Sequence, residues 1–83
     1  RLQRFDLYPN PTQGRTHVLL EFDRAEAFRL EVFDLVGQRI YTYAEKSRQL
    51  QKEIYLDQFP AGTYLVRVRT DRGQAVRKLV LME

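Results

Sequence analysis

The chain has 83 residues, of which 43% are hydrophobic and 30% charged, so it is long enough for one globular domain and too apolar for a disordered segment. It contains no cysteine, which excludes a disulfide framework and a thiolate metal site. Fourteen Lys and Arg outnumber eleven Asp and Glu, and this net charge of +3 permits an acidic partner without requiring one.

Apolar residues alternate with polar ones along most of the chain, and turn residues interrupt this alternation at short intervals. Such a pattern predicts an all-β sandwich or barrel. Seven short strands are predicted, at residues 5–8, 16–22, 28–35, 38–43, 50–56, 63–70 and 74–82. This number and spacing fit a seven-stranded immunoglobulin-like β-sandwich, although the buried Trp and paired Cys of antibody domains are absent.

The alternation also predicts the direction of side chains. The apolar positions that share the inward face of their strands are Val18, Leu20, Phe22, Phe28, Leu30, Val32, Tyr64, Val66 and Val68. The charged residues between them, which point outward, include Arg29, Glu31, Arg67 and Arg69. The polar segments 23–27 and 44–48 are interpreted as connections between strands.

Proline and glycine mark the predicted turns. The turn residues are Pro9, Asn10, Pro11, Gly14, Gly37, Pro60 and Gly62. Proline fixes φ and lacks a donor for the ladder, whereas glycine adopts a positive φ at no steric cost, so Gly37 can supply one if its turn needs it. We interpret these residues first as the scaffold of the fold.

Groups for catalysis are scarce. The chain has one histidine, His17, and one serine, Ser47, and it lacks the glycine-rich phosphate loops of nucleotide-binding proteins. His17 is interpreted as a surface residue, and the aspartates near turns as turn formers rather than metal ligands. The sequence therefore predicts no enzyme, no catalytic residue, no cofactor and no metal site.

Basic residues gather in the last predicted hairpin, at Arg67, Arg69, Arg72, Arg77 and Lys78. We interpret them as a solvated sheet face, because outward charges discourage edge-to-edge pairing. Docking to an acidic partner is the alternative. Nucleic-acid binding is not predicted, since exposed aromatic residues for base stacking are not evident.

Four pieces of sequence occur in an order typical of one family. They are Leu-Tyr-Pro-Asn-Pro at 7–11 followed by Gly14, Val-Phe-Asp-Leu-Val-Gly-Gln at 32–38, Phe-Pro-Ala-Gly-Thr-Tyr-Leu-Val-Arg-Val at 59–68, and Arg-Lys-Leu-Val at 77–80. In this order and spacing the chain resembles the type A C-terminal sorting domain (Por secretion tail family) of the type IX secretion system of Bacteroidetes. The similarity covers residues 7–82.

The resemblance implies a delivery role for a cargo protein rather than a reaction. It implies transit through the periplasm, recognition by the outer-membrane translocation machinery, and then usually removal by a sortase-like cysteine peptidase. The cargo becomes attached to anionic lipopolysaccharide at the cell surface or is secreted. We expect residues 1–5 to be the end of a preceding linker and residues 6–83 to be the sorting domain, a piece of a longer protein.

The resemblance also implies a recognition region near the end of the chain. Its residues are Gly62, Tyr64, Lys78, Leu79, Val80, Leu81 and Met82. A terminal strand at a sheet edge would offer unpaired backbone groups and flanking charge to a receptor, and it predicts weak self-association. Family members commonly end in basic or amide residues, whereas this chain ends in Glu83, which leaves processing by the peptidase open.

An immunoglobulin-like carbohydrate-binding or adhesive module is the alternative function. Carbohydrate sites normally present a platform of exposed aromatic rings, and the candidates for such a platform are Tyr41, Tyr43 and Tyr55.

Overall fold

The computed structural model describes residues 1–83 as one antiparallel sheet. Its strands are β1 (Leu2–Tyr8), β2 (Arg15–Phe33), β3 (Arg39–Tyr55), β4 (Gly62–Thr70) and β5 (Gly73–Leu81). Strand β2 pairs with β1, β3 and β4, and β5 pairs with β4. The all-β prediction is confirmed. None of the elements is a helix that could cross a membrane.

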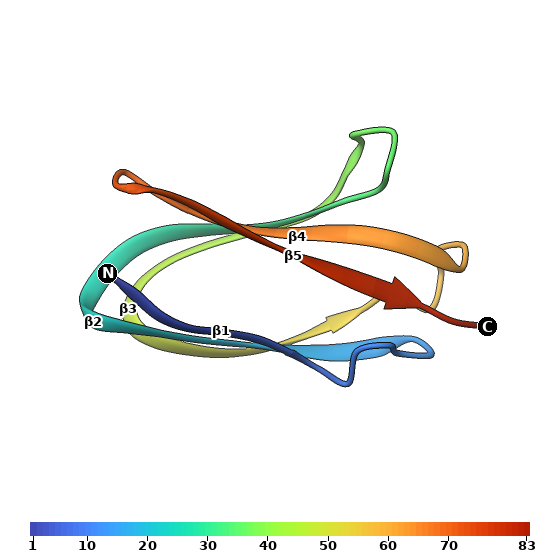
Figure 1. Ribbon diagram of the computed structural model, residues 1–83, viewed down its shortest axis with the longest axis horizontal. Coiled ribbons are helices and arrows are strands. Elements are labelled where there is room, and N and C mark those ends of the chain that lie inside the picture. Colours follow the sequence, from blue (N-terminus) through green and yellow to red (C-terminus); the bar gives the residue numbers. More distant parts are fainter.

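The sheet curls over on itself because β2 bends near its middle. The first half of β2 pairs with β1 and the end of β3, and its second half pairs with β4 and the start of β3. At the bend, residues 22–25 of β2 stand opposite the single residue Arg48 of β3. Extra residues on one strand of a pair bend that strand, so two layers come to face each other (Figure 1).

The predicted number of strands is wrong, and one curled sheet replaces the two sheets of the expected immunoglobulin-like sandwich. The expected strands 16–22 and 28–35 belong to β2, and the strands 38–43 and 50–56 belong to β3. The polar segments between them do not leave the sheet, because pairing resumes at Glu26 with Ser47 and continues with Ala27 and Lys46.

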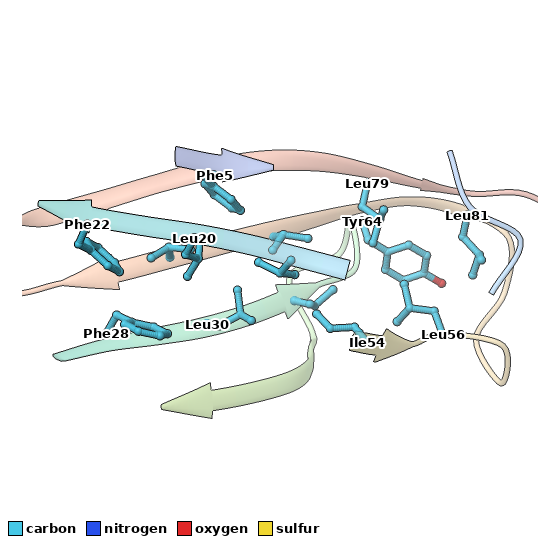
Figure 2. Close-up of a cluster of buried hydrophobic side chains, with 14 residues drawn as sticks. Phe5, Leu20, Phe22, Phe28, Leu30, Ile54, Leu56, Tyr64, Leu79 and Leu81 are labelled. Atoms are coloured by element: carbon cyan, nitrogen blue, oxygen red, sulfur yellow. The ribbon is translucent and has the colours of Figure 1, made fainter. Parts of the chain in front are cut away.

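Fourteen buried hydrophobic side chains form the core between the two layers (Figure 2). They are Phe5, Val18, Leu20, Phe22, Phe28, Leu30, Val32, Ile54, Leu56, Tyr64, Val66, Val68, Leu79 and Leu81. Phe22 and Phe28 flank the bend of β2, and their ring centroids lie 5.4 Å apart in a stacked arrangement. The stacked rings hold the layers together at the bend, and the predicted inward positions are confirmed.

Candidate recognition site

Strand β5 is an edge strand, and the loop after β1 closes the second half of its free edge. The Asn10 side chain donates to the carbonyl of Lys78 over 2.8 Å and accepts from the amide of Val80 over 3.0 Å. The backbone of Thr12 then donates to the Val80 carbonyl over 2.9 Å and accepts from the Met82 amide over 2.7 Å. The expectation of unpaired backbone groups in this part of the strand is therefore wrong.

The residues predicted for recognition differ in their accessibility. Tyr64, Leu79 and Leu81 are core residues, with exposed fractions of 5%, 0% and 4%. The Tyr64 hydroxyl also donates to the Pro60 carbonyl, which anchors the turn before β4. The predicted residues that a receptor can reach are Gly62, Lys78, Val80 and Met82, since Val80 is half-buried and the other three are exposed.

The predicted turn residues between β1 and β2 connect distant parts of the chain. The Pro9 carbonyl accepts from the Thr16 hydroxyl over 2.8 Å, and the Gly14 carbonyl accepts from the Leu56 amide over 2.7 Å. A Cβ atom on Gly14 would lie 3.2 Å from the Cβ atom of Asp57, tighter than most such contacts. Gly14 thus lets the loop approach the end of β3.

The turn between β2 and β3 is built around Asp34. Its Oδ1 atom accepts from the amides of Val36, over 3.1 Å, and Gln38, over 2.8 Å. Gly37 has φ of 92°, a conformation that residues with a Cβ atom rarely adopt, so the glycine predicted there is required. The turn projects from the body of the sheet (Figure 1), with Leu35 and Val36 exposed at its tip.

The polar residues considered as candidates for catalysis take part in surface ion pairs and hydrogen bonds. His17 Nε2 lies 3.5 Å and Arg15 Nε 3.3 Å from Glu53 Oε2. Tyr55 donates to the same carboxylate, which raises the pKa of the phenol. Ser47 donates to a backbone carbonyl. No group of three or more His, Asp or Glu side chains is placed to hold a metal ion.

The three tyrosines considered for a sugar platform do not share a surface. Tyr41 and Tyr43 are half-buried and pack against the core from the first half of β3. Tyr55 is 56% exposed at the other end of the strand. The arrangement therefore does not support the carbohydrate-binding alternative.

One cluster was missed by the sequence analysis. Glu31 in β2 is only 1% exposed, although its side chain points to the outer side of the sheet. Arg67 donates to Oε1 through Nε at 3.0 Å and Nη2 at 2.8 Å, and Arg39 donates to Oε2 at 3.0 Å. Arg69 approaches Oε2 to 3.9 Å, and the Arg67 guanidinium lies 4.8 Å from the centre of the Phe33 ring.

The electrostatics of this cluster favour an ionised Glu31. Burial alone would raise the pKa of the carboxyl, but the hydrogen bonds from Arg67 and Arg39, together with the charges of Arg67 and Arg69, outweigh burial and hold the pKa below its ordinary value. We call the outer side that carries Arg29, Arg39, Arg67 and Arg69 around Glu31 the arginine face. Alternation predicted outward side chains here, but no local signal shows that residues 36 positions apart form an ion pair.

A comparison with models of protein families matches residues 6–82 to the secretion system C-terminal sorting domain. The chain belongs to this family. A comparison with curated protein sequences gives no match.

The match to the sorting-domain family extends over nearly the whole sheet, from within β1 to just beyond β5. The sorting domain is the C-terminal signal for type IX secretion, so it interacts with that machinery and its cargo crosses the outer membrane. The family is not known for catalysis. The structure places Leu2–Tyr8 in one strand, and the assignment of residues 1–5 to a preceding linker stays a prediction.

Proposed function

We propose that this sorting domain is read by the outer-membrane translocation machinery through the outward side chains at the end of the chain. Lys78 and Met82 are exposed, Val80 is half-buried, and Gly62 faces Leu81 across the β4–β5 pair. The family match over residues 6–82 carries the proposal. The closed backbone edge supports recognition through side chains rather than through strand addition.

The proposal includes the later stages of delivery. The cargo passes through the periplasm, a sortase-like cysteine peptidase removes the domain, and the cargo becomes attached to the cell surface or is released. If the domain is removed, the exported cargo protein should have a lower molecular mass than its periplasmic precursor, and the difference should equal the mass of the domain. A carrier that reaches the surface with the domain still attached would show that this member is retained.

The test is a transplant. Residues 1–83 are fused to the C-terminus of a periplasmic fluorescent protein in a host that has the type IX system, and the exported fraction is measured. Deletion of residues 78–83 would also remove Leu79 and Leu81 from the core, so substitutions are the better probe. The probe variant is Lys78→Glu with Met82→Ser.

The matched control for that probe is Arg48→Glu with Val36→Ser, which reverses one charge and removes one exposed apolar side chain elsewhere. We expect the native fusion and the control to be exported and the probe variant to stay in the periplasm. Export of all three alike would contradict recognition through the C-terminal strand. Retention of the native fusion would contradict the sorting function itself.

Self-association is the weaker part of the proposal. It is predicted from the apolar run at residues 79–82, but Leu79 and Leu81 of that run point into the core. Asn10 and Thr12 close the neighbouring edge. Pairing between copies would have to use residues 74–77, where no backbone bond from the loop after β1 is made. Sedimentation velocity at high concentration measures it, and a monomer throughout would end the idea.

A further inference from the structure

The arginine face concentrates positive charge on one side of the molecule. It carries four arginines and a single glutamate, an excess as large as the formal net charge of +3 of the whole chain. Lys78 is opposite Leu65 in the β4–β5 pair and lies on the same side. The face is therefore continuous with the end of the chain that the proposed function assigns to recognition.

Glu31 orders this charge without neutralising it. One carboxylate holds the guanidinium groups of Arg39, Arg67 and Arg69 within 3.9 Å of its two oxygens. Each guanidinium has five N–H donors, and the side chains of Arg39 and Arg69 remain 49% and 48% exposed. Two ordered cations that share one buried counter-ion are prepared to bind further carboxylates from outside.

A second feature is a pair of like charges. Arg29 stands directly opposite Arg69 in the β2–β4 pair, and the hydrogen-bond partner of its guanidinium is Thr42, over 3.1 Å. Like charges directly opposite in a sheet are destabilising. An acidic group placed between these two arginines would remove the repulsion, so binding of an acidic partner would stabilise this face.

Apolar side chains lie beside the arginines and favour a protein as the occupant. Phe33 pairs with Leu65, and Val76, which is 42% exposed, pairs with Arg67. Arginine and aromatic residues are enriched in protein interfaces, where apolar contacts surround ordered charges.

We propose that the arginine face is a docking surface for an acidic protein surface of the export machinery, with carboxylates seated at Arg29, Arg39 and Arg69 around an apolar patch. The inference rests on the proposed function and names a second contact of the same domain. Binding through ordered charges also predicts attraction at a distance, which salt weakens.

The first experiment measures export of the same fusion with the face variant Arg29→Gln plus Arg69→Gln. The matched control is Arg24→Gln plus Arg48→Gln, which removes the same charge from exposed arginines near the bend of β2. We expect the face variant to lose at least tenfold in the exported fraction and the control to stay within twofold of native. Thermal melts of the purified domains check folding, and Arg29→Glu alone is the second variant if the double variant unfolds.

The second experiment identifies the class of occupant. A photo-crosslinking amino acid replaces Val76 on the arginine face or, as the control, Leu19 on the outer side of the other layer. We expect a protease-sensitive adduct at position 76 that Arg29→Gln plus Arg69→Gln abolishes, no such adduct at 19, and acidic residues in the crosslinked partner peptide. In parallel, the domain is mixed with phosphatidylglycerol vesicles.

Three results would overturn the inference in different ways. Equal export of the face variant and its control, with the native fusion exported, would refute the docking surface and leave the sorting function intact. Vesicle binding that depends on Arg29 and Arg69, with a lipid adduct at position 76, would replace the protein by a membrane. Failure of the native fusion to be exported would remove the sorting function and this inference together.

Discussion

The outer sides of the two layers of the sheet handle charge in opposite ways. On the layer of β1, the first half of β2 and the end of β3, the outward residues Arg4 and Arg15 each have a carboxylate beside them. Arg4 Nε lies 2.6 Å from Asp6 and Arg4 Nη1 3.4 Å from Glu21, and Arg15 lies 3.3 Å from Glu53. On the other layer, three of the four arginines of the arginine face, Arg39, Arg67 and Arg69, share the one buried carboxylate of Glu31. The chain thus has one outer side with locally paired charges and one with an excess of positive charge.

Burial explains why the ion pairs on the two outer sides contribute differently to the stability of the fold. The side chains of Arg4, Asp6 and Glu21 are about half exposed, so water and salt screen their attraction. The Glu31 side chain is 2% exposed and its hydrogen bonds run to Arg67 and Arg39. When a buried carboxylate loses its charge or its partners, the remaining charged groups lack an opposite charge. Substitutions at Glu31 are therefore expected to lower the free energy of unfolding more than substitutions at exposed carboxylates.

The largest effect is expected for Glu31→Gln. The amide cannot neutralise Arg67, Arg39 and Arg69, and breaking a buried ion pair from one side costs about 3 kcal/mol. Urea unfolding measures the change in the free energy of unfolding. The matched substitution on the other layer, Glu21→Gln, should cost far less because its partner Arg4 is exposed. Equal losses in the two variants would refute the contrast between the faces.

Acid should weaken the arginine face by protonating Glu31. Because the pKa of Glu31 in the folded protein lies below its ordinary value of 4.5, its ionised form contributes stability that is fully present above pH 4.5. This contribution is lost as the pH falls through the folded-state pKa.

Thermal melts between pH 6 and pH 2 measure that loss. Other carboxyls with a lowered pKa, such as those of Asp23 and Glu45, also contribute to acid unfolding, so the test is a difference between two proteins. The melting temperature of Glu31→Gln should fall less steeply with acid than that of the native chain. Parallel curves would mean that Glu31 is not held ionised by its arginines.

The sequence predicted the direction of side chains much better than the continuity of strands. Alternation identified inward residues such as Val18, Leu30 and Val66, because a half-buried strand repeats every two residues. It failed at residues 23–27, because a polar segment that bends within a strand has the same composition as a loop. Bulge geometry depends on the partner strand, which local sequence does not contain.

The two features that define the candidate surfaces depend on contacts between distant residues. Asn10 meets Lys78 across 68 positions, and Glu31 meets Arg67 across 36. Asn10 is predicted in a turn, and the charged residues between the inward positions, such as Glu31 and Arg67, are predicted to point outward; both predictions are correct about direction. Neither could reveal that the turn closes the edge of β5 or that three outward arginines cover an outward glutamate.

The smallest effect is expected for Arg29→Glu. The change in the free energy of unfolding should have opposite signs for this substitution and for the same substitution on the other layer. Arg29 stands opposite Arg69 and beside no carboxylate partner, so a glutamate at 29 replaces a repulsive cross-strand pair by an attractive one. Such pairs differ by about 0.5 kcal/mol, and we expect the free energy of unfolding to rise by that amount.

The same change in the other layer, Arg4→Glu, should lower stability, because it gathers three carboxylates at Asp6 and Glu21. Chemical denaturation of both variants at low salt measures the two signs, and high salt should shrink both changes. If both substitutions lower stability at low salt, the repulsion between Arg29 and Arg69 is already relieved within the free domain, and an acidic partner has nothing there to compensate.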